Sequence, residues 1–153
     1  MSRQRKITIG VGVVVPDPKT KSILVSRRLK KAGKDSLALP GGHIEEGETL
    51  VAAATRETFE ETGLIVRPRE LHGHTYVLHA DEWFREDKHT WTVYVVGDIV
   101  GGTLENREPE KHENWRWEEL WKLEEIVTEK DWLPMRALIY RMETIFNLDG
   151  GYC

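Results

Sequence analysis

Short apolar runs separated by polar and turn-forming residues dominate the chain, as in strands joined by tight connections. Residues Ile7–Val15 are apolar and mostly β-branched, so they predict a buried strand. Pro16 and Pro18 interrupt this run and Ser22–Arg28 resumes the strand pattern, which predicts a hairpin. Further strands are predicted over residues 37–39, 65–67, 71–79, 90–100 and 114–117.

Two segments have the residue pattern of helices. Residues Thr49–Thr62 begin at a threonine able to cap a helix, and Gly63 after them suits the left-handed conformation that ends one. Residues Leu133–Phe146 carry apolar side chains at i, i+3, i+4 and i+7, so they predict an amphipathic helix that covers a sheet. Together the elements predict an α/β (α+β) fold with a mixed sheet and two main helices.

Length and composition indicate one globular domain, which we expect to span residues 1–153. Apolar residues make up 39% and charged residues 31%, unlike disordered or membrane-spanning chains. The apolar runs are shorter than the roughly 20 residues that cross a bilayer, and no secretory-type apolar region follows the basic start. Cys153 is the only cysteine. A disulfide framework is therefore excluded, and the cytoplasm is the expected compartment.

Charge is distributed unevenly along the chain. The net charge of −4 argues against stable nucleic-acid binding, because such proteins need a basic surface. Residues 1–41 hold ten Lys and Arg against two Asp, whereas residues 42–61 hold six Glu against one Arg. Clustered carboxylates repel one another unless a cation lies among them. The acidic segment is therefore either a solvated helix face or a site for divalent cations.

Three glutamates of this segment share one face of the predicted helix. Glu57, Glu60 and Glu61 stand at i, i+3 and i+4, so their carboxylates project to the same side. Like charges at this spacing lower helix stability by roughly a few tenths of a kcal/mol per pair, so the helix itself gains nothing from them. Hard oxygen ligands of this kind suit Mg²⁺ or Mn²⁺.

Residues just before the helix complete the pattern. Glu48 lies ahead of the helix and Arg56 two turns into it, so an ion pair between them would brace the loop against the helix. Gly41 and Gly42 permit the close approach of a ligand. The carbonyl of Gly41 is therefore a candidate further metal ligand.

The segment from Gly42 to Leu64 resembles the Nudix box, Gly-x5-Glu-x7-Arg-Glu-U-x-Glu-Glu-x-Gly-U, in which U is an apolar residue. All of its fixed identities are present, at Gly42, Glu48, Arg56, Glu57, Glu60, Glu61 and Gly63. Thr58 is a departure, because it stands at a position that is usually aliphatic. The order of the predicted elements around the box is also similar to the family across nearly the whole chain.

This resemblance implies a Nudix-type α/β/α sandwich that hydrolyses a nucleoside diphosphate linked to another group, with Mg²⁺ as cofactor and Mn²⁺ as a substitute. It implies a catalytic or metal-binding role for the box residues Arg56, Glu57, Glu60 and Glu61. Glu57 and Glu61 are expected as the principal metal ligands and Glu60 as the third ligand or the general base, and the sequence leaves the choice of base open. Glu48 is expected to support the loop.

The polyphosphate is expected to bind near the start of the box. Arg28 is the first candidate and Arg27 the second, because both stand on the strand that leads into the box. Gly42 and His43 follow as candidate substrate contacts, and a plain loop role for His43 is equally compatible with the sequence.

A late loop and several aromatic residues carry weaker indications. Many family members have a glutamate in this loop that binds metal or acts as the base; Glu113 is the candidate, Glu110 the alternative, and a solvated acid the other interpretation. Trp115 and Trp117 could stack on a nucleobase, although tryptophan on a short strand is more often packed in a core. The same two interpretations apply to Tyr76, Trp83 and Trp91.

Outside the box, the short length and the Glu-Pro-Glu-Lys loop are similar to the MutT-like nucleoside triphosphate pyrophosphatases. The resemblance implies a small-molecule substrate, an NTP or dNTP, including oxidised ones, that is cleaved to NMP and pyrophosphate. Hydrolysis of a nucleotide sugar, ADP-ribose, a dinucleoside polyphosphate or an RNA cap is the enzymatic alternative, and a non-catalytic nucleotide-binding regulator is the other. Apolar strands and six tryptophans are compatible with a homodimer, and no membrane partner is expected.

Overall fold

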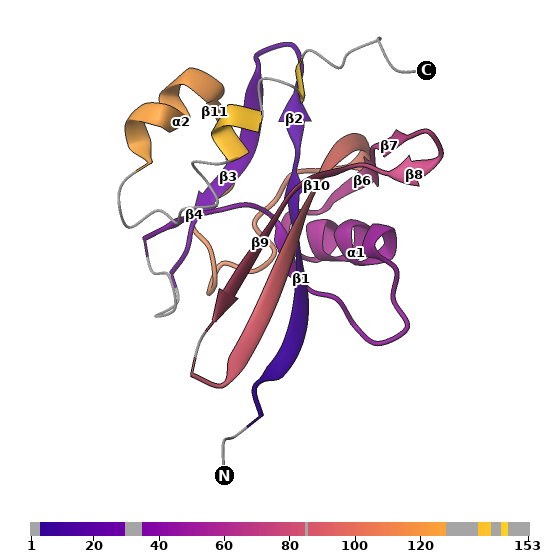
Figure 1. The fold of residues 1–153 in the computed structure, drawn as a ribbon. Helices are drawn as coiled ribbons and strands as arrows, with labels where there is room; N and C mark the ends of the chain where they lie inside the picture. Colours follow the sequence, from indigo (N-terminus) through magenta and orange to yellow (C-terminus); the bar gives the residue numbers. More distant parts are fainter. Residues whose placement is uncertain (1–3, 30–34, 85, 128–137, 142–144, 147–153) are drawn as a thin grey trace.

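The structure, a computed structural model, describes residues 4–29, 35–84, 86–127, 138–141 and 145–146. Its main sheet is mixed, as predicted (Figure 1). The strands in order are β5 (Gly41–His43), β1 (Lys6–Val14), β10 (Lys88–Gly102) and β6 (Leu64–Pro68), and β9 (Val77–Phe84) also pairs with β10. Strands β1 and β10 run parallel, whereas the other pairs are antiparallel.

A second, smaller sheet has β3 (Ser22–Arg27) as its central strand. Strand β3 pairs with β11 (Arg116–Glu119), β2 (Pro16–Asp17) and β4 (Leu37–Ala38). The predicted hairpin is present, but its first strand is the short β2 rather than β1. Strand β1 does not pair with β3 because its two edges are hydrogen-bonded to β5 and β10.

The single strand predicted over residues 71–79 is wrong. Strands β7 (Glu70–Leu71) and β8 (His74–Thr75) form a separate hairpin, and β9 begins only at Val77. The hairpin turns at His72 and Gly73, whose φ angles are 52° and 76°. A two-residue turn with both φ angles positive matches the twist of a hairpin, so the chain reverses here instead of continuing as a strand.

The predicted helix before Gly63 is confirmed as α1 (Leu50–Thr62). The Oγ1 atom of Thr49 accepts a hydrogen bond from the backbone N–H of Ala52 at 3.1 Å, and Gly63 ends the helix with a φ of 73°. Helix α2 (Leu120–Ile126) was not predicted, and Leu123 anchors it in the core. Residues 138–141 and 145–146 are helical, in agreement with the predicted C-terminal helix, whose other residues lie outside the described part of the chain.

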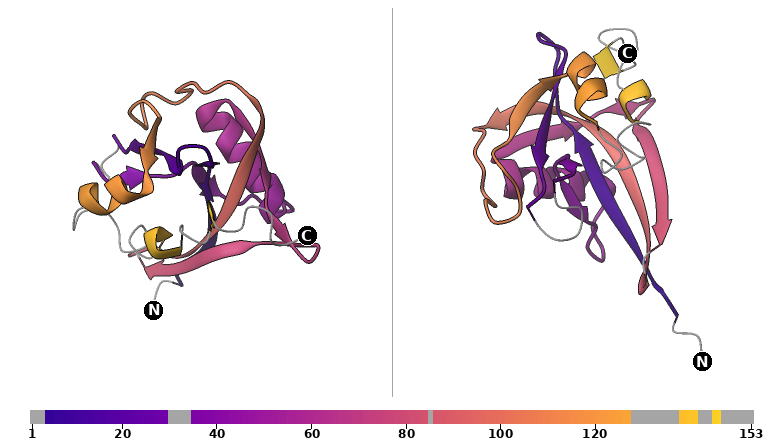
Figure 2. Two further views of the ribbon diagram at one scale, coloured as in Figure 1. Left: turned by 90° about the horizontal axis from the view of Figure 1, so that it is seen from above. Right: turned by 90° about the vertical axis from the view of Figure 1, so that its left-hand side faces the viewer.

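The main sheet lies between α1 on one face and α2 with the C-terminal helical residues on the other (Figure 2). Successive residues of a strand point to opposite faces, so Val13 of β1 belongs to the buried cluster that contains Ala53 and Ala54 of α1, and Val14 belongs to the one that contains Leu123 and Leu138. The predicted α/β/α sandwich is therefore confirmed. Among the described residues, no helix has the length and apolar character that a membrane span needs.

Candidate active site

The guanidinium of Arg56 ties the loop before α1 to the helix. Its Nε and Nη2 atoms donate to the two carboxylate oxygens of Glu48 at 2.6 and 2.8 Å, so the ion pair predicted from the sequence is present. Nη1 donates to Glu57 at 2.8 Å and to Glu60 at 3.2 Å, and Nη2 also donates to the backbone carbonyl of His43 at 3.1 Å. One cation thus fixes three carboxylates and the end of β5.

The pairing of Glu48 with Arg56 predicts how stability depends on pH. Hydrogen bonds from Arg56 and from the backbone of Glu45 lower the pKa of Glu48 from 4.5 to about 2. A carboxyl whose pKa is lower in the folded protein adds stability above its unfolded pKa, and this contribution is lost as the pH falls toward the folded value. We therefore expect Glu48→Gln to lower the Tm at pH 7 and to approach the wild-type Tm near pH 2. Thermal unfolding by circular dichroism measures both values, and equal Tm values at pH 7 would contradict the bracing role.

The three helix glutamates do not converge on a single point. Glu57 and Glu60 both accept from Arg56, and the side chain of Glu60 is half exposed. Glu61 turns to the other side, where its buried carboxylate accepts a hydrogen bond from the backbone N–H of Gly41 at 3.2 Å. The i, i+3, i+4 spacing places the three on one helix face, but Arg56 divides their carboxylates into two groups.

Glu57 lies in a tight and electrostatically unfavourable position. Burial raises its pKa above the usual value, the hydrogen bond from Arg56 opposes the rise, and the charges of Glu61 and Glu60 add to it. A Cβ atom on Gly42 would lie 2.4 Å from the carboxyl carbon of Glu57, so only glycine lets β5 pass this close to the carboxylate. A cation beside Glu57 would favour its charged form.

The loop after β10 brings further polar groups to Glu61. Arg28 forms a β-bridge with His112, and the backbone N–H of Leu29 donates to the carbonyl of Lys111 at 2.9 Å. These contacts place Nε2 of His112 3.7 Å from a carboxylate oxygen of Glu61. Ligand atoms of Glu61, Glu108 and His112 all lie within 4.8 Å of one another.

The late-loop glutamates predicted from the sequence lie elsewhere. Glu113 and Glu110 are exposed, and neither belongs to the cluster around Glu61. The acid of this loop that reaches Glu61 is Glu108, which the sequence analysis missed together with Lys111 and His112. The Glu-Pro-Glu-Lys motif contains Glu108, but its order along the chain does not indicate which of its acids faces inward.

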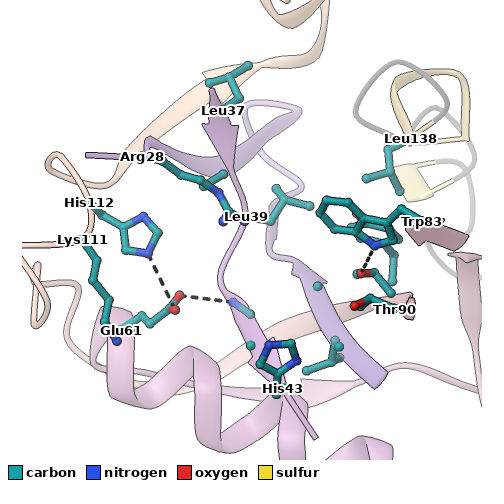
Figure 3. Close-up of a pocket in the computed structure, with 18 of the residues that line it drawn as sticks. Arg28, Leu37, Leu39, His43, Glu61, Trp83, Thr90, Lys111, His112 and Leu138 are labelled. Carbon is teal, nitrogen blue, oxygen red and sulfur yellow. Dashed lines mark hydrogen bonds and ion pairs between the residues drawn. The ribbon is translucent and has the colours of Figure 1, made fainter. Parts of the chain in front are cut away.

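A pocket of about 340 Å³ extends from Glu61 to Trp83 (Figure 3). Among the described residues that line it, Glu61 is the one acid, whereas Arg28, Lys88 and Lys111 are basic. Basic side chains therefore outnumber acids in the lining, with Lys111 also paired to Glu108 at 2.8 Å, and this excess favours an anionic ligand.

The other predicted substrate contacts divide between the pocket and its surroundings. Gly41, Gly42, His43 and Arg28 all line the pocket. Arg27 is not among the lining residues, and its Nη1 donates instead to the backbone carbonyl of Asp35 at 2.8 Å.

The tryptophans take different roles. Trp115 is buried, and its Nε1 donates to the backbone carbonyl of Glu61 at 3.2 Å, so it packs beneath the site and supports it from the core. Trp117 and Trp91 are partly exposed and do not line the pocket. Trp83 does line it, with its Nε1 donating to Oγ1 of Thr92 at 3.1 Å, and its ring forms the end opposite Glu61 (Figure 3).

Comparisons with known proteins agree with this geometry. The profile of the NUDIX domain family matches residues 6–141. The chain is 32% identical over 152 residues to an RNA pyrophosphohydrolase of Caulobacter vibrioides, with 90% of this chain and 82% of that protein covered. It is 34% identical over 93 residues to an ADP-ribose pyrophosphatase of Methanocaldococcus jannaschii, covering 61% of this chain and only 51% of that relative's length.

Solved structures show the same fold. A MutT protein from Methanosarcina mazei Go1 superposes with a TM-score of 0.71 at 20% identity, over 93% of this chain and 96% of that one. A MutT NUDIX hydrolase from Burkholderia pseudomallei superposes with the same TM-score at 19% identity, over 90% of this chain and 98% of that one. At these identities the likeness concerns the fold alone.

Proposed function

Because the chain belongs to the NUDIX domain family, whose members hydrolyse nucleotide derivatives, we propose that its substrate is a nucleoside triphosphate. The products are a nucleoside monophosphate and pyrophosphate. Both ribo- and deoxyribonucleotides, including those with an oxidised base, are within this proposal.

The observation that carries the proposal is the charge of the pocket. Glu61 stands at one end, with Arg28 and Lys111 lining the same pocket. Arginine and lysine bind phosphate oxygens through charge-assisted hydrogen bonds, so the two cations would hold a polyphosphate with a bridging oxygen near Glu61. Trp83 lines the end opposite Glu61, Lys88 also lines the pocket, and the space between would take the rest of the nucleotide.

The donor set fits a divalent cation of the Mg²⁺ type, with Mn²⁺ as a substitute. Glu61 is buried and accepts a hydrogen bond from the backbone N–H of Gly41, and Glu57 is partly buried near the charges of Glu60 and Glu61, so both favour a nearby cation. We propose Glu57, Glu61 and the carbonyl of Gly41 as ligands, with Glu60 as third ligand or base. When bound, such a cation neutralises phosphate oxygens and lowers the pKa of a coordinated water. The metal role of Glu113 stays a prediction from the sequence.

The chain's own residues prepare the site for this chemistry. Gly41 holds one oxygen of Glu61 by its N–H and Trp115 holds the backbone carbonyl, so the carboxylate has a fixed direction. A carboxylate within hydrogen-bond reach of the attacking water takes its proton as general base, and Glu61 and Glu60 are the candidates. Arg56 keeps Glu57 and Glu60 oriented through its fixed contacts with Glu48.

A second candidate is a 5′-triphosphate carried by RNA. The support for it is the 32% identity to the RNA pyrophosphohydrolase of Caulobacter vibrioides over 90% of this chain. The reacting group is the same triphosphate, so the site residues proposed above would serve both substrates. ADP-ribose is a third candidate through the archaeal relative, and its match covers a smaller part of this chain.

A substrate panel tests the proposal. Canonical and 8-oxo nucleoside triphosphates, a 5′-triphosphorylated oligoribonucleotide, ADP-ribose, a diadenosine polyphosphate and a nucleotide sugar are incubated with Mg²⁺, and monophosphate and pyrophosphate are quantified. We expect free triphosphates to give both products with the highest kcat/KM. A kcat/KM that is tenfold higher for the oligoribonucleotide would transfer the assignment to RNA ends. Tight nucleotide binding without any product would identify a regulator instead.

A homodimer and a cytoplasmic location, both predicted from the sequence, remain proposals. Size-exclusion chromatography with light scattering tests the homodimer, and fractionation of cells tests the cytoplasmic location.

A further inference from the structure

One face of the main sheet is apolar and only partly covered. Strands β1, β10 and β9 extend past α1, in the lower half of Figure 1. Directly paired residues point to the same face of a sheet, and the register pairs Trp91 with Ile9 and Val95 with Val77. This is the face that packs on α1, because Val95 belongs to the buried cluster of Ala53 and Ala54. Its exposed apolar residues outside the area of the helix, here called the exposed sheet face, are Ile7, Ile9, Val77, Phe84 and Trp91.

The exposed sheet face presents a large apolar area to solvent. Ile7 is 68% exposed, Phe84 57% and Ile9 47%. Together the five residues expose on the order of 500 Å² of surface. The largest apolar patch on a monomeric protein covers roughly 300–600 Å² and often marks an interaction site, so this face lies in the upper part of that range.

The polar side chains of this face balance one another. His89 is paired in register with Ile7 and Phe84, so it lies among the apolar residues, and its Nε2 is hydrogen-bonded to a carboxylate oxygen of Glu82 at 2.5 Å. The guanidinium of Arg5 lies 5.5 Å from the centre of the Phe84 ring. One acid and one permanent cation leave no excess charge on the face. Nucleic acids and anionic membranes attract clusters of basic residues, so these charges do not favour either as the partner.

We propose that the exposed sheet face is the interface between two copies of this chain, packed face to face about a two-fold axis. A standard interface buries about 800 Å² on each partner, and about 65% of a homodimer interface is apolar. The roughly 500 Å² of the exposed sheet face matches this apolar share. A two-fold axis brings a surface against itself, and a face that holds both an acid and a cation is complementary to its own copy.

The interface would also protect β9, and it leaves the pocket free. Among the described strands, β9 pairs with β10 alone, so its other edge is open. An exposed edge strand with apolar side chains is prone to aggregate, and a partner packed on Val77 and Phe84 would shield both ends of β9. Trp83 and Thr90, which line the pocket, lie on the opposite face of the same strands. The proposal therefore assigns a face to the homodimer predicted from the sequence, and it does not depend on the proposed function.

Sedimentation equilibrium of the full chain over a range of micromolar concentrations tests the interface. We expect the wild type to have twice the mass of one chain. Ile7→Lys and Trp91→Lys should each raise the dimer Kd by roughly 100-fold or more, because a two-fold interface contains each substituted hot spot twice. The matched controls are Val100→Lys and Trp121→Lys, which change exposed apolar residues outside the exposed sheet face and should dimerise like the wild type.

Near-UV circular dichroism confirms that each variant is folded, and if Trp91→Lys fails this check, Ile7→Lys alone decides. A monomeric wild type would overturn the inference, as would wild-type dimerisation of the folded Ile7→Lys variant or dissociation caused by Trp121→Lys instead. Co-sedimentation with vesicles of phosphatidylcholine and phosphatidylglycerol tests the other occupant. A monomeric wild type that binds these vesicles, with binding lost in Trp91→Lys, would assign the face to a lipid surface and overturn the dimer.

Discussion

Glu61→Gln is expected to lower kcat by roughly 10²- to 10⁴-fold, the range of a lost general base, while the protein remains folded. Glu61 is the one acid among the described residues that line the pocket, and its carboxylate is buried. Glutamine keeps the shape of the side chain and an oxygen that can accept from the N–H of Gly41. It loses the negative charge that binds a metal ion or accepts a proton. The substitution should therefore lower kcat while leaving the packing around residue 61 unchanged.

Steady-state kinetics with the best triphosphate, together with Tm values, measure this result. Glu125→Gln, an exposed residue of α2, is the charge-matched control and should keep wild-type kcat. Glu60→Gln should lose less than Glu61→Gln, because Glu60 is half exposed and bound to Arg56. Normal turnover in Glu61→Gln, or a larger loss in Glu60→Gln, would remove Glu61 from the centre of the mechanism.

Local sequence determined most of what could be predicted about this site. The caps at Thr49 and Gly63 and the pair between Arg56 and Glu48 depend on residues within one helix and its preceding loop. Their geometry follows from helical spacing and short connections, which the order of residues contains. The mixed sheet was predicted for a similar reason, because apolar runs of strand length indicate buried strands, whereas the α/β/α sandwich was expected from the resemblance to the Nudix family.

Contacts between distant segments could not be predicted in this way. His112 reaches Glu61 only because the loop after β10 pairs with Arg28 at the end of β3. Nothing local distinguishes Glu108, which turns inward, from Glu110 and Glu113, which remain exposed. The sequence also did not show that Arg56 binds Glu57 and Glu60 but not Glu61. The i, i+3, i+4 spacing places the three glutamates on one helix face, but it does not determine which carboxylates a neighbouring cation binds.

Alanine substitutions at the two adjacent glycines of β5 are expected to have different effects, one on stability and the other on catalysis. In Gly41→Ala, the added Cβ would lie 2.1 Å from the backbone carbonyl oxygen of Val11 on the paired strand. Backbone atoms cannot move aside without disrupting the pairing of β5 with β1, so overpacking of about 3 kcal/mol is expected. For a chain of this size, that loss lowers the Tm by roughly 6–12 °C. Thermal unfolding of the purified variant measures it.

Gly42→Ala is expected to lower kcat more than it lowers stability. Its Cβ would lie 2.4–2.6 Å from the carboxylate atoms of Glu57, the mobile end of a side chain. Glu57 can swing away, so the Tm should fall much less than in Gly41→Ala, while kcat falls by roughly tenfold or more because a proposed metal ligand is displaced. The double variant Gly42→Ala, Glu57→Gln provides the decisive comparison. If displacement of Glu57 causes the loss, the two changes will be far from additive, whereas full additivity would show that Gly42 acts through another contact.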